Sequence, residues 1–239
     1  MTEMIPTEIN GRWTLLLPEH RAVRPEWPYW EAQRLAAMAH VIGPGDVVYD
    51  IGAEEGDFPA LWASWGADVV LFEPNERVWP NIRAIFEANR LTHRLKGAHI
   101  GFAGPESRHS LSKLPQEWPE AAFGPIIGDH GFCNLSERPD LDVVTIDECW
   151  RDLGAPRPTV ITMDVEGAEF EVIQGAFETL RDVRPKVFVS IHQEFARDMY
   201  GMRDVTGAIV TYMGAHDYDA EHICTDHESH WKFTPREEV

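Results

Sequence analysis

The sequence of 239 residues predicts an α/β protein built on a parallel, doubly wound sheet, with helices on both faces and an antiparallel hairpin at one edge. Short apolar runs alternate with segments in which apolar residues recur at helical spacing, a pattern typical of parallel strands joined by helices. Near the end of the chain, strand-like runs at 220–225 and 230–234 follow each other without a helix between them. Because antiparallel strands need only a short turn, this pair predicts the hairpin.

The individual elements follow from these patterns in chain order. Residues 1–45 predict an N-terminal arm with a short strand at 12–17 and a helix at 26–42 that stops at the Gly-Pro-Gly turn. Further strands are expected at 47–53, 68–74, 95–104, 142–150 (a short strand entering a helix), 160–167 and 186–195. Further helices are expected up to about residue 65 and at 75–91, 168–180 and 205–213.

Two segments carry additional local signals. Asn75 is placed to cap the helix at 75–91, and Pro80 marks either a kink or a late start of that helix. Residues 105–140 are rich in Pro, Gly and Ser, and helical or strand periodicity fades there. We therefore expect an insertion at about 105–140, with a hairpin at 129–140.

Composition and charge restrict the function classes. Hydrophobic residues make up 44% of the chain and aromatic residues 10%, which is enough for a packed core and excludes a disordered chain. Lys and Arg total 21 against 40 Asp and Glu, so the formal net charge is -19. Such a field repels phosphate backbones, and we expect no general nucleic-acid binding, whereas a small neutral or cationic ligand remains compatible.

Cysteine usage and the apolar runs indicate a location. The three cysteines are widely spaced, and no CxxC pair or disulfide framework is present, which is typical of a reducing compartment. The first residues have neither a basic start nor an apolar signal region, and no apolar run reaches the length of a membrane span. We therefore expect a soluble, cytoplasmic protein.

The stretch DIGAEEGDF, residues 50–58, predicts a cofactor-binding turn after the first strand of the sheet. Ligands of open parallel sheets bind beyond the carboxyl ends of the strands, where Asp50, Gly52, Ala53, Glu54 and Gly56 lie. The glycine spacing is GxxxG, whereas dinucleotide sites use GxGxxG, and acidic side chains there would repel phosphates. S-adenosylmethionine (SAM), with a sulfonium, an ammonium and no phosphate, suits this turn better than NAD or ATP. Alternatively, the turn has glycines for geometry alone and solvated acids.

Two further strand ends carry carboxylates. Glu73 ends the next strand, in the position where an acid commonly accepts hydrogen bonds from a ribose diol. In residues 161–176, Asp164 ends a strand and Glu166 lies in the following turn, at the same edge of the sheet as Asp50. Glu169 falls in the first helical turn and is expected to serve the helix dipole, and Glu166 is alternatively a helix cap.

Several segments together resemble the FkbM-type family of SAM-dependent methyltransferases. They are VVYDIGAEEGDF, VLFEP, VVTIDE, ITMDVEGAEFEVIQGAFETL and VFVSIH, spread in this order over roughly residues 46–195. The resemblance implies a seven-stranded, Rossmann-like class I methyltransferase sheet within residues 46–239. It also implies SAM as cofactor and methyl transfer to a hydroxyl of a small-molecule or glycan acceptor.

The resemblance transfers to individual positions. The cofactor loop of the family is matched by Asp50, Gly52 and Gly56, and its ribose-binding acid by Glu73. The DVEGAE segment is matched by Asp164, Glu166, Gly167 and Glu169. The histidine that ends the fifth strand is matched by His192. Glu54 and Glu55 depart from the more usual GANxG loop. Ser190 stands where members often have a Glu. These departures bear on the acceptor more than on the cofactor.

Methyl transfer to a hydroxyl needs a group that accepts a proton. His192, which titrates near neutral pH, is the first candidate for this base, and Asp164 and Glu166 are the other catalytic candidates. His192 is alternatively a histidine that is hydrogen-bonded under the tail. The last 24 residues are rich in His, Asp and Glu, which could form a divalent-metal site or complete the substrate pocket, alone or together with Asp164 and His192. No spacing there is a recognised metal signature, so we expect solvated surface and leave the metal unassigned.

Other functions stay open from the sequence alone. N-methylation is compatible with the acidic surface, and a non-catalytic Rossmann-like binding module would keep the same pocket as a scaffold. A dehydrogenase is disfavoured by the acidic GxxxG turn. The polar residues at three strand ends, Glu73, Asp164 and His192, argue against a pure scaffold.

Overall fold

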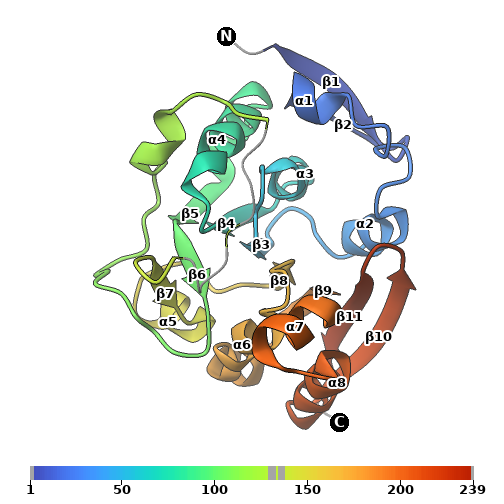
Figure 1. The fold of residues 1–239 in the computed structure, drawn as a ribbon, viewed down its shortest axis with the longest axis vertical. Helices are drawn as coiled ribbons and strands as arrows, with labels where there is room; N and C mark the ends of the chain where they lie inside the picture. The colour runs from blue at the N-terminus through green and yellow to red at the C-terminus, as the bar shows by residue number, and fades with distance from the viewer. Residues whose placement is uncertain (1–2, 129–132, 134–137, 238–239) are drawn as a thin grey trace.

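A seven-stranded sheet forms the centre of the computed structural model, which describes residues 3–128, 133 and 138–237 (Figure 1). In sheet order the strands are β10 (Tyr218–Thr225), β11 (Ser229–Pro235), β9 (Lys186–Ile191), β8 (Val160–Met163), β3 (Val47–Ile51), β4 (Asp68–Phe72) and β5 (Leu95–His99). β3, β4, β5, β8 and β9 are parallel, and β11 is antiparallel to both β9 and β10. The predicted parallel sheet with an antiparallel hairpin at one edge is therefore confirmed.

The five parallel strands are buried on both faces because apolar side chains occupy both alternating positions. Val48 and Val69 belong to one core, and their neighbours Tyr49 and Val70 belong to the other. The first core includes residues of α2 (Ala32–Ala39), α3 (Asp57–Ser64) and α4 (Trp79–Ala88). The second includes residues of α5 (Ile146–Arg151), α6 (Glu169–Gln174), α7 (Gln193–Tyr200) and α8 (Val205–Ala215). Helices on both faces of the sheet are thus also confirmed.

The N-terminal arm begins with a hairpin of β1 (Met4–Ile9) and β2 (Trp13–Pro18), followed by the short α1 (Glu19–Ala22). The side chain of Asn89, just after α4, accepts from the amide of Leu16 at 2.9 Å and donates to the Leu16 carbonyl at 2.9 Å, which fixes β2 against α4. The helix expected at 26–42 is shortened to α2, because Glu31 adopts a left-handed conformation with φ of 45° just before it. The division of the chain at residue 45 stays a prediction.

Three other expectations about the elements need correction. The strand expected at 95–104 is interrupted at Ile100, and its second part is β6 (Gly101–Ala103), which pairs with β7 (Asp142–Val144) in a separate small parallel sheet. β7 is therefore not a strand of the main sheet. The strand expected at 186–195 ends at Ile191, because the chain turns at His192 and α7 begins at Gln193.

The remaining described segments are short helical turns and loops. They are η1 (Glu76–Val78), η2 (Thr92–Arg94), η3 (Glu120–Phe123) and η4 (Thr179–Val183). Pro80 lies in the first turn of α4, so it marks a late start, and the Asn75 side chain accepts from the amide of Arg77 as a cap of η1. Most of the hairpin expected at 129–140 lies outside the described residues. None of the helices in the described ranges has the length and apolar character needed to cross a membrane.

Candidate functional site

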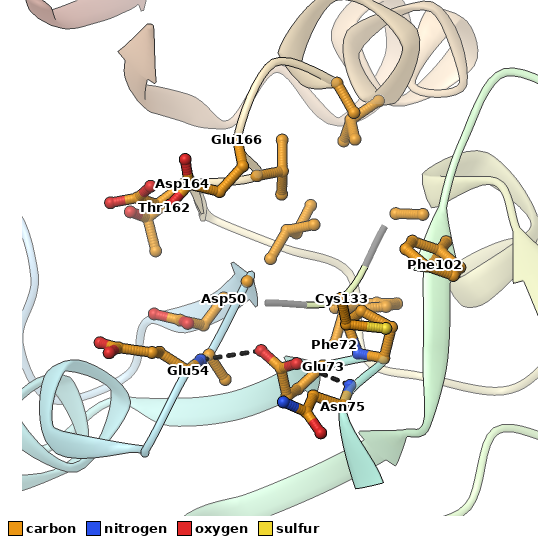
Figure 2. Close-up of a pocket in the computed structure, with 18 of the residues that line it drawn as sticks. Asp50, Glu54, Phe72, Glu73, Asn75, Phe102, Cys133, Thr162, Asp164 and Glu166 are labelled. Carbon is orange, nitrogen blue, oxygen red and sulfur yellow. Dashed lines mark hydrogen bonds between the residues drawn. The ribbon is translucent and has the colours of Figure 1, made fainter. Parts of the chain in front are cut away.

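A cavity of about 500 Å³ opens at the carboxyl ends of β3, β4 and β8, where parallel sheets bind their ligands. Its walls come from the turns that follow these strands, from α2 and from the β10–β11 turn. Figure 2 shows Glu73 and Asn75 on one side of the cavity and Asp164 and Glu166 on the opposite side. The sheet thus brings together most of the residues that the sequence predicted at strand ends.

Two glycines allow the turn after β3 to approach its neighbours closely. Gly52 has φ of 87°, and a Cβ atom there would lie 1.9 Å from the carbonyl oxygen of Asp164. Gly56 has φ of 90°, and a Cβ atom there would lie 2.9 Å from Cα of Ile82 on α4. Any larger residue would push the turn away from β8 or from α4, so the GxxxG spacing is a requirement of this geometry. Ala53, between the two, is buried and lines the cavity.

The carboxylate of Glu73 ties the turns after β3 and β4 to each other. One oxygen accepts from the amide of Glu54 at 2.9 Å, and the other accepts from the amide of Asn75 at 2.7 Å (Figure 2). Glu73 is 7% exposed and lines the cavity. Each ionised carboxylate oxygen has more than one acceptor site, so Glu73 can accept further hydrogen bonds from a ligand.

The acids of the turn are compensated inside the protein by one arginine, Arg21 of α1. Its guanidinium lies 3.1 Å from Glu54 and 3.4 Å from Glu55, and its Nε donates to Asp57 at 2.9 Å. The Arg21 side chain is only 3% exposed. Burial alone would lower its pKa, but Asp57, Glu54 and Glu55 raise it, so the guanidinium stays charged. Arg21 therefore balances one of the three negative charges of the turn, and Glu54 stays half exposed at the cavity.

The two neighbouring glutamates of the turn have different surroundings. The side chain of Glu54 is half exposed, and Glu54 lines the cavity. Glu55 is 1% exposed and points to the core, where Asn81 donates to it at 2.7 Å and His20 lies against it. Glu55 is therefore a residue that joins α1, the turn and α4.

Asp50 is buried at the end of β3. Its Oδ2 accepts from the indole N–H of Trp62 at 2.6 Å, which connects β3 to α3. Burial raises the pKa of Asp50 to about 7, and the hydrogen bond from Trp62 opposes this increase. Asp50 also lines the cavity, so it supports the turn and contributes to the wall.

Opposite Glu73, carboxylates surround His192, which directly follows β9. Its Nδ1 lies 2.7 Å from Oε1 of Glu169, a side chain with no exposed surface. Its Nε2 lies 3.0 Å from Oε1 of Glu228, 3.4 Å from Oε2 of Glu166 and 3.5 Å from Oδ1 of Asp164. Asp164, Glu166 and Glu228 line the cavity, and the His192 ring lies behind them.

The charges of this group shift the pKa values of its members. Burial alone would lower the pKa of His192, but Glu169, Glu228 and Asp164 raise it to about 11. Burial and the charge of Glu228 raise the pKa of Asp164 well above its usual range, and burial raises that of Glu166. In the protein alone, His192 is thus a cation among carboxylates, and an imidazolium has no lone pair for a proton.

Three of the seven described non-glycine residues with positive φ line the same cavity. Glu31, Glu54 and Glu166 all line it, and their φ angles are 45°, 46° and 53°. A left-handed conformation costs a residue with a side chain roughly 1–2 kcal/mol, and such strain clusters at functional sites. These three glutamates therefore support the cavity as the functional site.

Sequence reasoning missed three residues of the site. Arg34 of α2 is buried, with Nη1 3.6 Å from Asp164 and Nη2 donating to Thr162 at 3.2 Å. Arg21 and Glu228 were not predicted either. The sequence signal that could have identified Arg34 is its position four residues before Met38, on the buried face of the helix.

The tail expected to be solvated surface is partly buried. His230 has no exposed surface, and its ring nitrogens lie 3.0 Å from Ser190 and 3.0 Å from Asp226. The His227 ring stacks on Trp30 with centroids 4.4 Å apart. The expectation is wrong for His230 and Glu228, because β11 inserts between β9 and β10 and brings Glu228 to the carboxyl end of β9, whereas Asp226 and His227 are exposed as expected.

The profile of the methyltransferase FkbM domain matches residues 50–220 of this chain. This range holds the glycine turn, Glu73, Asp164, Glu166, Glu169 and His192. The chain belongs to the FkbM methyltransferase family. The resemblance indicated by the sequence motifs is therefore confirmed. Arg21, Arg34 and Glu228 lie outside the FkbM match, so the sequence beyond it completes the site in this chain.

Three known proteins are similar to this FkbM family member. The hexuronic acid methyltransferase AglP of Haloferax volcanii is 27% identical over 149 residues, which are 62% of this chain and 56% of AglP. A crystal structure of methyltransferase FkbM from Methylobacillus flagellatus KT matches with a TM-score of 0.51 and 20% identity, covering 79% of this chain and 43% of that one. A precorrin-6y C5,15-methyltransferase from Geobacter metallireducens matches with a TM-score of 0.48 and 11% identity, covering 87% and 88%.

Two of the matched proteins are much longer than this chain. The chain spans about half the length of AglP and of the Methylobacillus protein, since it covers 56% and 43% of them. The Methylobacillus structure supports the Rossmann-like methyltransferase fold of this chain.

Proposed function

We propose that the protein transfers a methyl group from SAM to an oxygen atom of a small-molecule or glycan acceptor. The observation that carries the proposal is the meeting, in one cavity, of the glycine turn with Glu73 and of the carboxylates around His192. The first half has the features of a nucleoside site, and the second half supplies groups for proton transfer. Membership of the FkbM methyltransferase family supports this combination.

The cavity has donor and acceptor groups that fit SAM. The carboxylate of Glu73 is fixed by two amides and retains acceptor capacity for a ribose diol. Gly52 lets the backbone of the turn pack directly against the carbonyl of Asp164, which joins the two halves of the cavity. The residues proposed to hold the cofactor are Asp50, Gly52, Ala53, Glu54, Gly56, Glu73 and Asp164. SAM supplies a methyl group on a sulfonium, which needs alignment and no further activation.

We assign the proton acceptor to a carboxylate. Of the three catalytic candidates, Asp164 and Glu166 line the cavity and His192 lies behind them. Asp164 is oriented by Arg34 at 3.6 Å and by His192 at 3.5 Å. As the new carbon–oxygen bond forms and the carbon–sulfur bond breaks, the hydroxyl proton passes to Asp164 and a neutral thioether leaves. His192 is then a positioning residue.

The acceptor class is proposed from one relative and from the cations of the cavity. AglP is named a hexuronic acid methyltransferase and is 27% identical over the matched region. A hexuronic acid is an anion and requires positive groups in an otherwise acidic protein. Arg24 lines the cavity and can serve this purpose, whereas Arg34, which also lines it, is paired with Glu31 and Asp164. We therefore take a sugar-type acceptor with a carboxylate as the first class to test.

Calorimetric titration with SAM and with NADH tests the cofactor. We expect saturable SAM binding and no NADH binding, and a folded protein that fails to bind SAM would overturn the proposal. A methyl-transfer assay with labelled SAM then compares hexuronic acid glycans, neutral glycans and amines. Transfer to amines alone would indicate an N-methyltransferase, and SAM binding without transfer to any acceptor class would indicate a binding module.

A variant pair tests the assignment of the proton acceptor. Asp164→Asn removes the proposed base, and we expect kcat to fall at least about 100-fold. Glu171→Gln is the matched control, because Glu171 lines the same cavity and is not in contact with His192. If Asp164→Asn retains near-normal kcat, or if both variants lose kcat equally, the assignment is wrong.

A further inference from the structure

We propose that Asp164, Glu166, His192 and Glu228 form a binding site for one divalent metal ion at the wall of the cavity. The role of such an ion in catalysis rests on the proposed function, whereas its binding does not. Asp164, Glu166 and His192 each offer a ligand atom, and these atoms all lie within 4.8 Å of one another. Glu228 adds a fourth ligand from the β10–β11 turn, 3.0 Å from the ring of His192.

The spacing of these atoms matches a coordination shell. Nε2 of His192 lies 3.0 Å, 3.4 Å and 3.5 Å from single oxygens of Glu228, Glu166 and Asp164. Neighbouring ligand atoms of an octahedral ion with bonds of about 2.1 Å are separated by about 3 Å. The oxygens of Asp164 and Glu166 and the imidazole nitrogen thus have the mutual spacing of ligands around one ion, and the Glu228 oxygen lies at ligand spacing from the same nitrogen.

Two buried atoms of this group lack hydrogen bonds, and a cation would satisfy the one that faces the carboxylates, Nε2 of His192. His192 is 7% exposed, and its Nε2, aimed at the three carboxylates, has no hydrogen-bond partner of acceptable geometry. Oε2 of Glu228 is buried and also has none. Leaving such a group unsatisfied costs about 1–3 kcal/mol, more when it is charged. An ion bound by Nε2 removes this cost for the nitrogen.

Glu169 holds His192 in the orientation that a metal ligand needs. Its fully buried carboxylate accepts from Nδ1 of His192 at 2.7 Å and from the amide of Gly167 at 3.0 Å. With the ring proton on Nδ1, the lone pair of Nε2 faces Asp164, Glu166 and Glu228. A carboxylate behind the distal nitrogen is the usual support of a metal-bound histidine.

Two other groups of described residues have the required spacing but are already satisfied. The first contains Glu31, His227 and His230, and the carboxylate of Glu31 is bound to the cation Arg34. The second contains Cys224, Asp226 and His230, and both ring nitrogens of His230 have partners in Ser190 and Asp226. The group around His192 is therefore the one that favours an ion.

The ligand set indicates the type of ion and its use. Carboxylates suit Mg²⁺ and Mn²⁺, and an added imidazole favours a transition ion, so Mn²⁺ is the probe of choice. An ion here would lie beside Asp164, whose carbonyl oxygen faces Gly52 in the cofactor turn. It could bind the acceptor hydroxyl, lower the pKa of that hydroxyl and attract an acceptor carboxylate. The ion would thus add the positive charge that a hexuronic acid requires.

Electron paramagnetic resonance of Mn²⁺ tests the site on the full chain after treatment with EDTA. Bound Mn²⁺ loses its sharp aqueous signal, and we expect one equivalent to bind. Electron spin echo modulation should show one nitrogen coupled to the bound ion. Failure to bind Mn²⁺, or binding without nitrogen coupling, overturns the proposal and needs no variant.

Variants assign the ligands. His192→Gln and Glu228→Gln should each weaken Mn²⁺ binding at least tenfold, and His192→Gln should abolish the nitrogen coupling. Glu169→Gln should weaken binding about 10- to 100-fold through the histidine it positions. Glu171→Gln, the matched control on the same helix, should leave Mn²⁺ affinity unchanged. Equal binding by all four variants contradicts the ligand set.

SAM titration of the same preparation separates the two proposals. SAM binding without Mn²⁺ binding overturns the metal site and leaves the proposed function intact. Mn²⁺ binding without SAM binding supports the metal site and overturns the proposed function.

Discussion

Arg21 is the residue on which the charge balance of the acidic turn depends. Its guanidinium is the partner of three carboxylates, and those of Glu55 and Asp57 are buried. Removing one partner from a buried ion group leaves uncompensated charges in a poor solvent. We expect Arg21→Met to lower the free energy of unfolding by about 3–5 kcal/mol, measured by urea denaturation.

An exposed arginine provides the control for this prediction. Arg197 pairs with Asp198 on the surface, where both side chains are more than half exposed. Exposed ion pairs contribute little to stability, so Arg197→Met should leave the free energy of unfolding nearly unchanged. Similar losses in both variants would contradict the special role of Arg21.

His99 at the end of β5 predicts a pH dependence. It is 2% exposed, its Nε2 has no hydrogen-bond partner, and burial lowers its pKa from 6.5 to about 4. As pH falls from about 6.5 to about 4, the unfolded chain binds a proton and the folded chain does not, so stability decreases. Within this window His99 lowers the free energy of unfolding by about 1.4 kcal/mol for each pH unit of acidification. Above pH 6.5 it causes no such loss.

His99→Gln should remove the loss of stability that His99 causes between pH 6.5 and pH 4. We expect the free energy of unfolding of the wild type to fall more steeply than that of the variant between pH 6.5 and pH 4. His93, exposed in η2, is the control, and His93→Gln should follow the wild-type profile. Parallel profiles for wild type and His99→Gln would show that His99 is protonated in the folded state.

At the scale of elements, the turn after β3 is held by its close approach to the turn after β8. Gly52→Ala places a methyl group 1.9 Å from the Asp164 carbonyl, at φ of 87°. Gly154 has φ of 73°, and a Cβ atom there meets nothing within 4 Å. Gly154→Ala thus costs only the left-handed conformation, about 1 kcal/mol, whereas Gly52→Ala should cost at least about 2 kcal/mol more.

Chemical denaturation and SAM titration measure the consequence of this pair of substitutions. We expect Gly52→Ala to lose both stability and SAM affinity, because the turn and Asp164 must separate. Gly154→Ala should retain SAM affinity. If the two variants are equally stable, the turns do not pack as the structure describes.

The helices and strands also show which parts of the site can be predicted from the sequence. Asp164 and His192 were predicted at strand ends because an apolar run followed by polar residues is a local pattern. Glu228 was not, because its place beside β9 depends on strand order, which no local periodicity encodes. Arg21 was missed because its partners are 33 to 36 positions away in the chain. The first three residues of α7, 193–195, were read as strand, since no glycine or proline separates them from the apolar run of β9.

At the scale of the molecule, the site is assembled from segments far apart in the chain. α1 and α2 supply arginines, the parallel strands supply carboxylates and His192, and the last turn supplies Glu228. Figure 1 places α2 beside the β10–β11 hairpin, so both ends of the chain close the same side of the cavity. Folding of the whole chain is therefore required before the group around His192 forms.

The net charge of -19 predicts how salt acts on this assembly. Self-repulsion of like charges destabilises a compact state, and the screening length falls from about 30 Å at 0.01 M salt to about 10 Å at 0.1 M. We expect Tm to rise as KCl is increased over this range, in the presence of EDTA so that divalent ions do not contribute. KCl and sodium sulfate at equal ionic strength should act alike if screening is the cause. A Tm that stays constant or falls would mean that the acidic side chains are compensated across the surface, as Arg21 compensates the turn.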